Sequence, residues 1–156
     1  MKKHIGVKLI EAEPMTYGDF NKEKYGDNRI ETEFAKKNVN SEGYKVVYEG
    51  GYVSWSPKQV FEKAYYELDR KNKVTITQED VDGFFKKVES IKQGEKTTVT
   101  TVTLINGFEI IEASSCVDPD NFDMEIGEKI CIDRIKNKVW ELLGFLLQTG
   151  IGGFKK

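Results

Sequence analysis

The sequence contains one histidine and two cysteines, and neither cysteine belongs to a CxxC motif. These three side chains are too few for a structural zinc site, which takes four cysteine or histidine ligands. The N-terminal segment also lacks the apolar core of a signal peptide. We therefore expect Cys116 and Cys131 to be free thiols in a reducing cytoplasm.

Long apolar runs are absent as well, and none approaches the ~18 residues of a membrane-spanning helix. The net charge of −2 gives the whole chain no attraction for nucleic acid. We expect no membrane and no DNA as partners. At 156 residues with 38% apolar and 12% aromatic side chains, the chain suits one compact domain or two small ones.

Catalytic motifs are missing too. The sequence has no Walker loop, no GxSxG and no HExxH. Ser114, Ser115 and Cys116 could serve as nucleophiles, but His4 lies in the other half of the chain on a predicted strand. We expect neither enzymatic activity nor a cofactor.

The first part of the chain, residues 1–68, is predicted to form a small sheet with one helix. Alternating apolar residues over 3–12 predict a strand that ends at Pro14, whereas 17–43 is polar and predicts a loop or a weak helix. Residues 43–56 hold two β-branched and aromatic runs joined by a Gly-Gly pair, which predicts a hairpin. A helix should follow with Ser56 as N-cap and Pro57 as first residue, and its apolar side should comprise Val60, Phe61, Ala64 and Tyr65.

The second part, residues 74–156, follows a linker-like stretch at 69–73. Thr77 precedes Asp80 by three residues, which predicts a capped helix with an apolar stripe of Val81, Phe84, Phe85 and Val88. Residues 96–114 are rich in threonine and β-branched side chains. An Asn-Gly pair in their middle predicts an antiparallel hairpin.

A long C-terminal helix is predicted from Asp118 and Pro119, as N-cap and first turn, through about residue 147. Such a helix would be ~43 Å long. One side of it carries Phe122, Ile126, Ile130, Ile135, Val139, Leu142, Leu143 and Leu146. One small sheet cannot cover that length, so we expect the helix to pack in an oligomer. The predicted fold class is α+β.

The acidic segment 114–123 does not match a calcium loop. With Asp118 in the first position, Phe122 occupies the fifth position and Lys129 the twelfth, where a bidentate acid is required. Helix capping by these acids needs no ligand.

A nucleotide site is the remaining binding hypothesis. Arg134 and Lys138 are four residues apart and project from one side of the helix. Phe108 and Phe122 could stack on a base, and Asp118 and Asn121 could contact a base edge. The alternative is that the two cations pair with Asp133, Glu141 or solvent and that both phenylalanines are core residues.

Residues 97–148 carry a motif that adds to this hypothesis. It runs from the NGF turn through "SSCVDPDNFD" and "IG" to "RIKNKVWELLGFLLQ". The segment resembles a family of small phage and prophage proteins that contains the first-described Thoeris anti-defence sponge, and 76–85 is also similar to that family. Residues 1–68 resemble an N-terminal module of several phage accessory proteins, which implies no function for it.

The resemblance implies a protein that inhibits Thoeris defence in the cytoplasm of an infected or lysogenic bacterium. Members bind and sequester glycocyclic ADP-ribose, and some bind cyclic di- or trinucleotides, without degrading them. Their sites lie between protomers of a homodimer that can build into a larger ring such as a hexamer. By motif, Phe108 and the Asp118–Asn121 turn would hold the base, and Arg134 and Lys138 the phosphates.

One departure from the family concerns Lys138, which stands where we expect a second arginine. The lysine keeps the charge but loses the two-pronged hydrogen bonding of a guanidinium. The alternative function is a phage accessory module that binds a host or phage protein.

Overall fold

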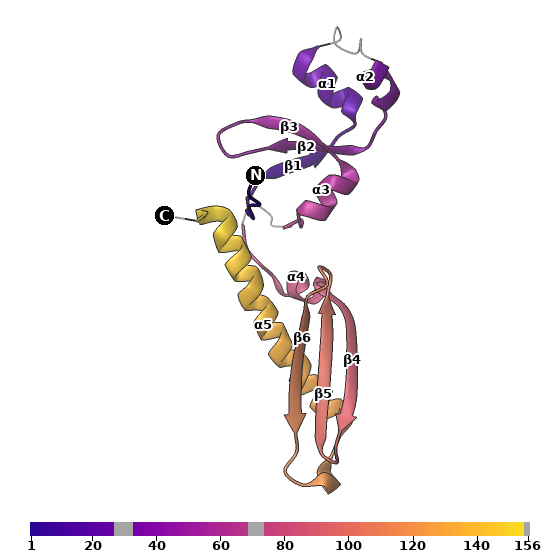
Figure 1. Ribbon diagram of the computed structural model, residues 1–156, viewed down its shortest axis with the longest axis vertical. Helices are drawn as coiled ribbons and strands as arrows, with labels where there is room; N and C mark the ends of the chain where they lie inside the picture. Colours follow the sequence, from indigo (N-terminus) through magenta and orange to yellow (C-terminus); the bar gives the residue numbers. More distant parts are fainter. Residues whose placement is uncertain (27–32, 69–73, 155–156) are drawn as a thin grey trace. The chain divides into compact units, whose positions relative to one another are not determined.

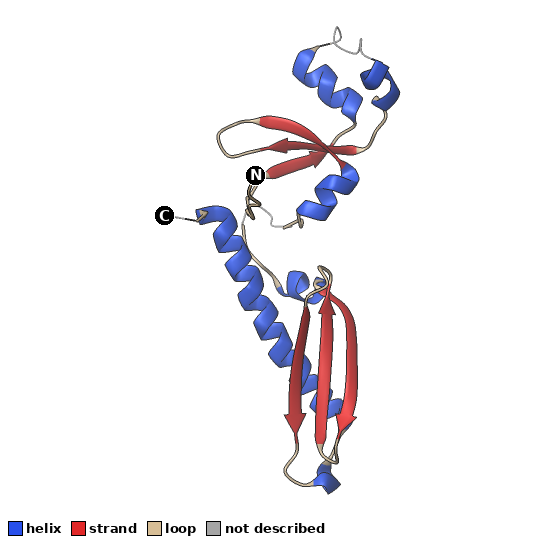
Figure 2. Cartoon of the chain, in the orientation of Figure 1, coloured by secondary structure: helices blue, strands red, loops and turns tan. Residues whose placement is uncertain are grey.

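The computed structural model describes residues 1–26, 33–68 and 74–154 (Figure 1). The linker predicted at 69–73 lies outside the described residues. The chain forms two compact units: Leu68–Thr149, and Met1–Glu67 together with Gly150–Lys156. The fold class is α+β, as predicted, with two three-stranded antiparallel sheets and a long C-terminal helix (Figure 2).

The sheet of the N-terminal unit has the order β1-β2-β3, with β1 at Glu11–Pro14, β2 at Gly43–Val47 and β3 at Val53–Pro57. The predicted β2–β3 hairpin is confirmed, and both glycines of its turn adopt a positive φ that suits glycine. The predicted strand over 3–12 is wrong for most of its length. Only 11–14 pair with β2, and Ile5 is 88% exposed.

Three helices accompany this sheet: α1 (Tyr17–Tyr25), α2 (Glu33–Asn38) and α3 (Lys58–Ala64). The prediction of a weak helix within 17–43 holds for α1 and α2. Helix α3 begins one residue later than predicted, with Pro57 at the N-cap and no side-chain capping bond. Its apolar side is only partly as predicted, because Phe61 stacks between the rings of Tyr44 and Tyr65, whereas Val60 and Ala64 are exposed.

The second unit begins with α4 (Gln78–Gly83), whose predicted capping box is present. Thr77 Oγ1 accepts a hydrogen bond from the backbone N–H of Asp80. In return, the carboxylate of Asp80 accepts a hydrogen bond from the backbone N–H of Thr77 at 2.6 Å. The predicted helical stripe through Val88 is wrong beyond Phe84. The chain turns into strand β4 (Phe85–Gln93), where Val88 lies opposite Val102.

Strand β4 joins the predicted hairpin to form a sheet of order β4-β5-β6, with β5 at Thr97–Leu104 and β6 at Glu109–Ser115. The Asn-Gly turn between β5 and β6 is confirmed. Gly107 has φ +83°, and the Asn106 side chain accepts a hydrogen bond from the backbone N–H of Phe108 at 3.0 Å. In the order β4-β5-β6, strand β6 is an edge strand of the sheet.

Two caps precede the long helix instead of one. Asp118 caps a short 3₁₀ helix, η2 (Pro119–Asn121), by accepting from Asp120 N–H. Phe122 is extended, and Asp123 then accepts from the N–H groups of Glu125 and Ile126 at 2.9 and 3.0 Å. Helix α5 runs over Met124–Gly152. The predicted start at Asp118 was wrong, because Asp123 is the cap that the long helix uses.

The core of this unit lies between one row of α5 and the inner face of the sheet. Cys131, Ile135, Val139 and Leu143 recur every four residues and are buried. The last three of these pack with a cluster from α4 and the sheet: Val81, Phe84, Val102, Leu104 and Ile110. Other members of the predicted stripe remain exposed at 38–60%: Ile126, Ile130, Leu142 and Leu146. One sheet therefore covers only part of the apolar surface of α5.

Candidate functional site

An exposed row on α5 has two cations at its centre and apolar side chains at both ends. Its members are spaced four residues apart: Ile126, Ile130, Arg134, Lys138, Leu142 and Leu146. Ile130, Arg134, Lys138 and Leu142 each directly precede one of the four buried core residues of α5, and Ile126 and Leu146 continue the same four-residue spacing at the two ends. The exposed row therefore runs along α5 beside the row that packs on the sheet. The two cations lie next to strand β6, with which both interact.

Arg134 is fixed against the free edge of the sheet. Its Nη1 donates a hydrogen bond to the backbone carbonyl of Ala113 in β6 at 2.9 Å. A guanidinium carries five N–H donors in a planar fork, so this bond positions the group without exhausting it. The residue remains exposed. Arg134 can therefore present donors to an anion at the edge of β6.

Lys138 forms an ion pair with Glu112 of β6. The Glu112 side chain is only 17% exposed, whereas that of Lys138 is 50% exposed. The structure thus pairs these cations with β6 rather than with Asp133 or Glu141, the acids considered from the sequence. In the free protein, Lys138 already has a counter-ion.

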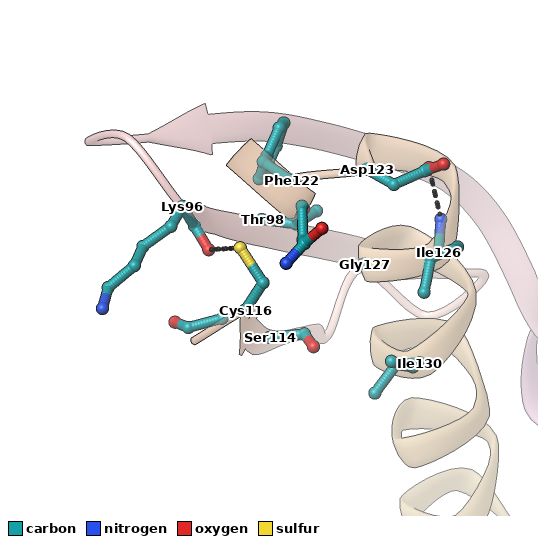
Figure 3. A pocket seen from close by; sticks show the side chains of 11 residues that line it. Lys96, Thr98, Ser114, Cys116, Phe122, Asp123, Ile126, Gly127 and Ile130 are labelled. Atoms are coloured by element: carbon teal, nitrogen blue, oxygen red, sulfur yellow. Dashed lines mark hydrogen bonds between the residues drawn. The ribbon is translucent and has the colours of Figure 1, made fainter. Parts of the chain in front are cut away.

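A hollow of about 100 Å³ lies at the N-terminal end of this row (Figure 3). Ser114 and Cys116 line it from the end of β6, Asn121 and Phe122 from the loop, and Ile130 from α5. Small-molecule sites typically measure 300–1,000 Å³. The hollow is therefore large enough for a fragment of a nucleotide but not for a whole cyclic dinucleotide.

The loop beside the hollow is held by local hydrogen bonds. The thiol of Cys116 donates to the carbonyl of Asp118 at 3.1 Å and contacts that of Lys96 at 3.6 Å. Asp118 itself uses its carboxylate to cap η2. Asn121 is exposed at the rim. The carboxylate of Asp118 is thus already engaged, and the side-chain amide of Asn121 is better placed to contact a ligand.

Phe122 is half-buried and lies under a cation from β4. The Nζ of Lys92 stands 4.1 Å from the centre of the Phe122 ring. A cation over one face of the ring leaves at most the other face for a base. Lys92 was not predicted from the sequence, because only the unexpected strand β4 brings it here.

Phe108 lies far from Asp118, Asn121 and Phe122, the predicted site residues of the loop. It is 55% exposed, directly before β6, whereas Asp118, Asn121 and Phe122 follow the other end of that strand (Figure 1). Seven strand residues at about 3.4 Å each separate these ends by about 20 Å. One protomer therefore brings Asn121 and Phe122 close to the α5 row, but it does not bring Phe108 to them. Neither phenylalanine is a core residue.

Other features expected from the sequence can be compared with the structure. Cys116 and Cys131 are free thiols, as predicted, with Cys131 buried. Across residues 1–26, 33–68 and 74–154, no group of three or more His, Cys, Asp or Glu side chains is arranged to hold a metal ion. Within the same residues, no helix has both the length and the apolar character needed to cross a bilayer.

The comparison with protein families settles part of the identity. The model of the phage protein family described as N4 Gp49/phage Sf6 gene 66 matches residues 58–151, more than half of the chain. The chain belongs to this phage protein family. The match spans α3, the second sheet and nearly all of α5, so it includes every residue of the candidate site. No curated protein and no solved structure matches the chain.

Proposed function

We propose that this phage protein is an anti-defence protein that binds a cyclic nucleotide immune signal and withholds it without degrading it. The observation that carries the proposal is the pair of cations at the β6 edge, Arg134 and Lys138. They follow Ile130 by one and two turns of α5, and Ile130 lines the hollow together with Asn121 and Phe122. The resemblance of residues 97–148 to the Thoeris anti-defence sponges supports the same ligand class. Glycocyclic ADP-ribose is the first candidate, and cyclic oligonucleotides are the second.

Each side chain has a role in this proposal. Arg134 and Lys138 bind phosphate oxygens through charge-assisted hydrogen bonds. Asn121 contacts the edge of a base, the free face of Phe122 stacks on it, and Asp118 holds the loop in shape. No group in this set is asked to break or form a covalent bond, so the proposed protein is not an enzyme.

The position of Phe108 supports a site shared between two copies. If a two-fold axis passed near the middle of β6, the β6 strands of the two copies would be antiparallel. Phe108 of the partner subunit would then approach the Asp118–Phe122 loop of the first copy. The exposed apolar ends of the α5 row, Ile126, Ile130, Leu142 and Leu146, offer the contact surface for such a dimer. The assembly proposed is a homodimer or a larger ring such as a hexamer, acting in the host cytoplasm.

A protein-interaction module is the second candidate function. The observation that favours it is that each unit has exposed aromatic side chains outside the candidate site, such as Tyr52 at 67% in the first unit and Phe145 at 71% in the second. Exposed side chains of this kind are typical of contact surfaces between proteins. On this hypothesis the partner would be a host or phage protein.

Retention of a nucleotide distinguishes the two functions. The purified protein is incubated with cyclic ADP-ribose isomers and cyclic di- and trinucleotides, separated from free ligand, and heated to release what it holds. Chromatography of an intact nucleotide supports the sponge, and a degraded nucleotide contradicts binding without chemistry. An empty supernatant across the panel favours the interaction module. Arg134→Ala serves as the control for capture at the proposed site.

A further inference from the structure

Glu112 is the residue of β6 that pairs with one of the two cations and directly precedes the residue bonded to the other. It projects from the inner face of β6, in register with the fully buried Thr100 of β5, and its carboxylate pairs with the Nζ of Lys138. Among the described residues, Lys138 is the one cation that pairs with it. The neighbouring Arg134 is bonded to the carbonyl of Ala113, the next residue along β6.

The low exposure of Glu112 makes this ion pair costly to break. A carboxylate that is mostly withdrawn from water is destabilised when its partner leaves, unless another donor replaces that partner. An anion that binds Lys138 must draw the ammonium away from Glu112 or share it. A bare anion offers no donor in return, and it also adds negative charge beside the carboxylate.

We propose that Glu112 is a selectivity residue, which keeps Lys138 from simple anions and favours phosphates that carry a hydroxyl group. A ribose hydroxyl next to the bound phosphate can donate to the carboxylate that Lys138 vacates. Inorganic pyrophosphate has no ribose hydroxyl, and the titrations are run at alkaline pH so that it carries no P–OH donor either. This inference rests on the proposed function, since it assigns the anion site to Arg134 and Lys138, and it narrows the ligand class to ribose phosphates.

The inference is tested with inorganic pyrophosphate and linear ADP-ribose as probes, by calorimetric titration of the full-length protein. Glu112→Gln removes the competing charge while keeping the side-chain shape, so pyrophosphate should bind about tenfold tighter or more than to wild type. ADP-ribose should gain less, because its hydroxyl groups already satisfy Glu112. Glu109→Gln makes the same change of charge at an exposed position of the same strand and should leave both affinities unchanged.

A second background separates displacement of Lys138 from a general effect of charge. In Lys138→Met protein, the gain from Glu112→Gln should largely disappear, because there is no ammonium left to release. A gain that persists in this background overturns the inference, as does Glu112→Gln protein that binds pyrophosphate no tighter than wild type. An equal gain for both probes overturns the preference for ribose phosphates.

The experiments distinguish a failure of this inference from a failure of the proposed function. A tightened pyrophosphate site in a protein that retains no cyclic nucleotide supports Glu112 as selectivity residue and contradicts the sponge. A protein that captures a cyclic nucleotide but gains nothing from Glu112→Gln keeps the sponge and removes this role. A thermal melt of every variant confirms that the fold is intact.

Discussion

Gly127 in the first turn of α5 lies directly against Thr98 of β5. A Cβ added to Gly127 would stand 2.1 Å from Thr98 Oγ1 and 2.6 Å from Thr98 Cβ. Thr98 is itself buried, so it has no open space into which to move. This close approach lets the start of the helix reach the sheet beside the hollow, and a larger residue would push the two apart.

Gly127→Ala should therefore destabilise the second unit by about 1–3 kcal/mol, the cost of overpacking a tight contact. Gly144→Ala in the same helix is the matched control, because no atom lies within 4 Å of its added Cβ. Alanine at an open helical position should stabilise by up to about 1 kcal/mol. Urea unfolding of both variants measures the difference, and equal stability would contradict this packing.

The N-terminal cap of α5 gives a second test. Asp123→Ala removes the acceptor for two backbone N–H groups of the helix and should cost about 0.5–2 kcal/mol. Asp118→Ala affects only the short η2 turn and should cost less. The free energies of unfolding decide between them. A larger loss for Asp118→Ala would restore the helix start predicted from the sequence.

The start of α5 was predicted at the wrong aspartate because the local sequence offers two equivalent caps. Asp118 and Asp123 are both good capping residues, and Pro119 favours a helical start after Asp118. Local chemistry cannot choose between them. The choice depends on where α5 meets β5, and hence on the non-local fit of Gly127 against Thr98.

The second sheet likewise has one feature that is determined locally and one that depends on contacts distant in the sequence. The Asn106-Gly107 turn was predictable because its backbone conformation is fixed by those two residues. Strand β4 was not, because Val88 and Ile91 are three residues apart, a spacing that also suits one face of a helix. Pairing with β5 makes it a strand, and a register shift between Phe85 and Lys87 breaks the simple alternation.

The candidate site was predictable only where it is local. Arg134 and Lys138 are neighbours because helical geometry makes them so. Glu112 could have been noticed from its alternation with Ile110 on β6, which places both on the inner face. The separation of Phe108 from Asn121 follows from the length of β6 and the start of α5, and neither boundary was fixed by the motif.

The pH dependence of stability should reflect Asp82, at the end of α4. A hydrogen bond from Lys136 of α5, supported by one from Gln78, lowers the pKa of Asp82 below its ordinary value. A lowered pKa means that the pair contributes stability at neutral pH and loses it as the pH falls through the pKa of the folded state. Asp82→Asn should therefore melt slightly lower than wild type at pH 7, and the difference should vanish in acid. A difference that is constant with pH would show that the ion pair is not its cause.

Self-association should depend on the C-terminal part of the exposed α5 row. Leu142 is 45% exposed beside a sheet that does not cover it, so Leu142→Glu would place a charge in the proposed interface. We expect light scattering to show a dimer or larger assembly for wild type and a monomer for this variant. Ile91→Glu, an equal change on the exposed face of β4, is the control and should leave the assembly intact. A monomeric wild-type protein at micromolar concentration would contradict the interface.

Ligand binding should depend most directly on Arg134. Arg134→Ala removes a guanidinium that bonds to the Ala113 carbonyl and carries further donors for phosphate. The loss should weaken nucleotide binding by about 1.5–3 kcal/mol, the range for hydrogen bonds to charged groups. Calorimetry with the nucleotide retained by wild type measures this loss.

The folded state should tolerate that change, because Arg134 is exposed and its removal leaves no cavity next to the buried Ile135. Lys129→Ala removes a positive charge from a neighbouring row of α5, outside the candidate site, and serves as the control for charge alone. If both variants lose affinity equally, the effect is a general attraction for anions. If Arg134→Ala melts like wild type and binds at full affinity, the guanidinium serves only to cover the edge of β6. A loss confined to Arg134→Ala places the phosphate at that edge.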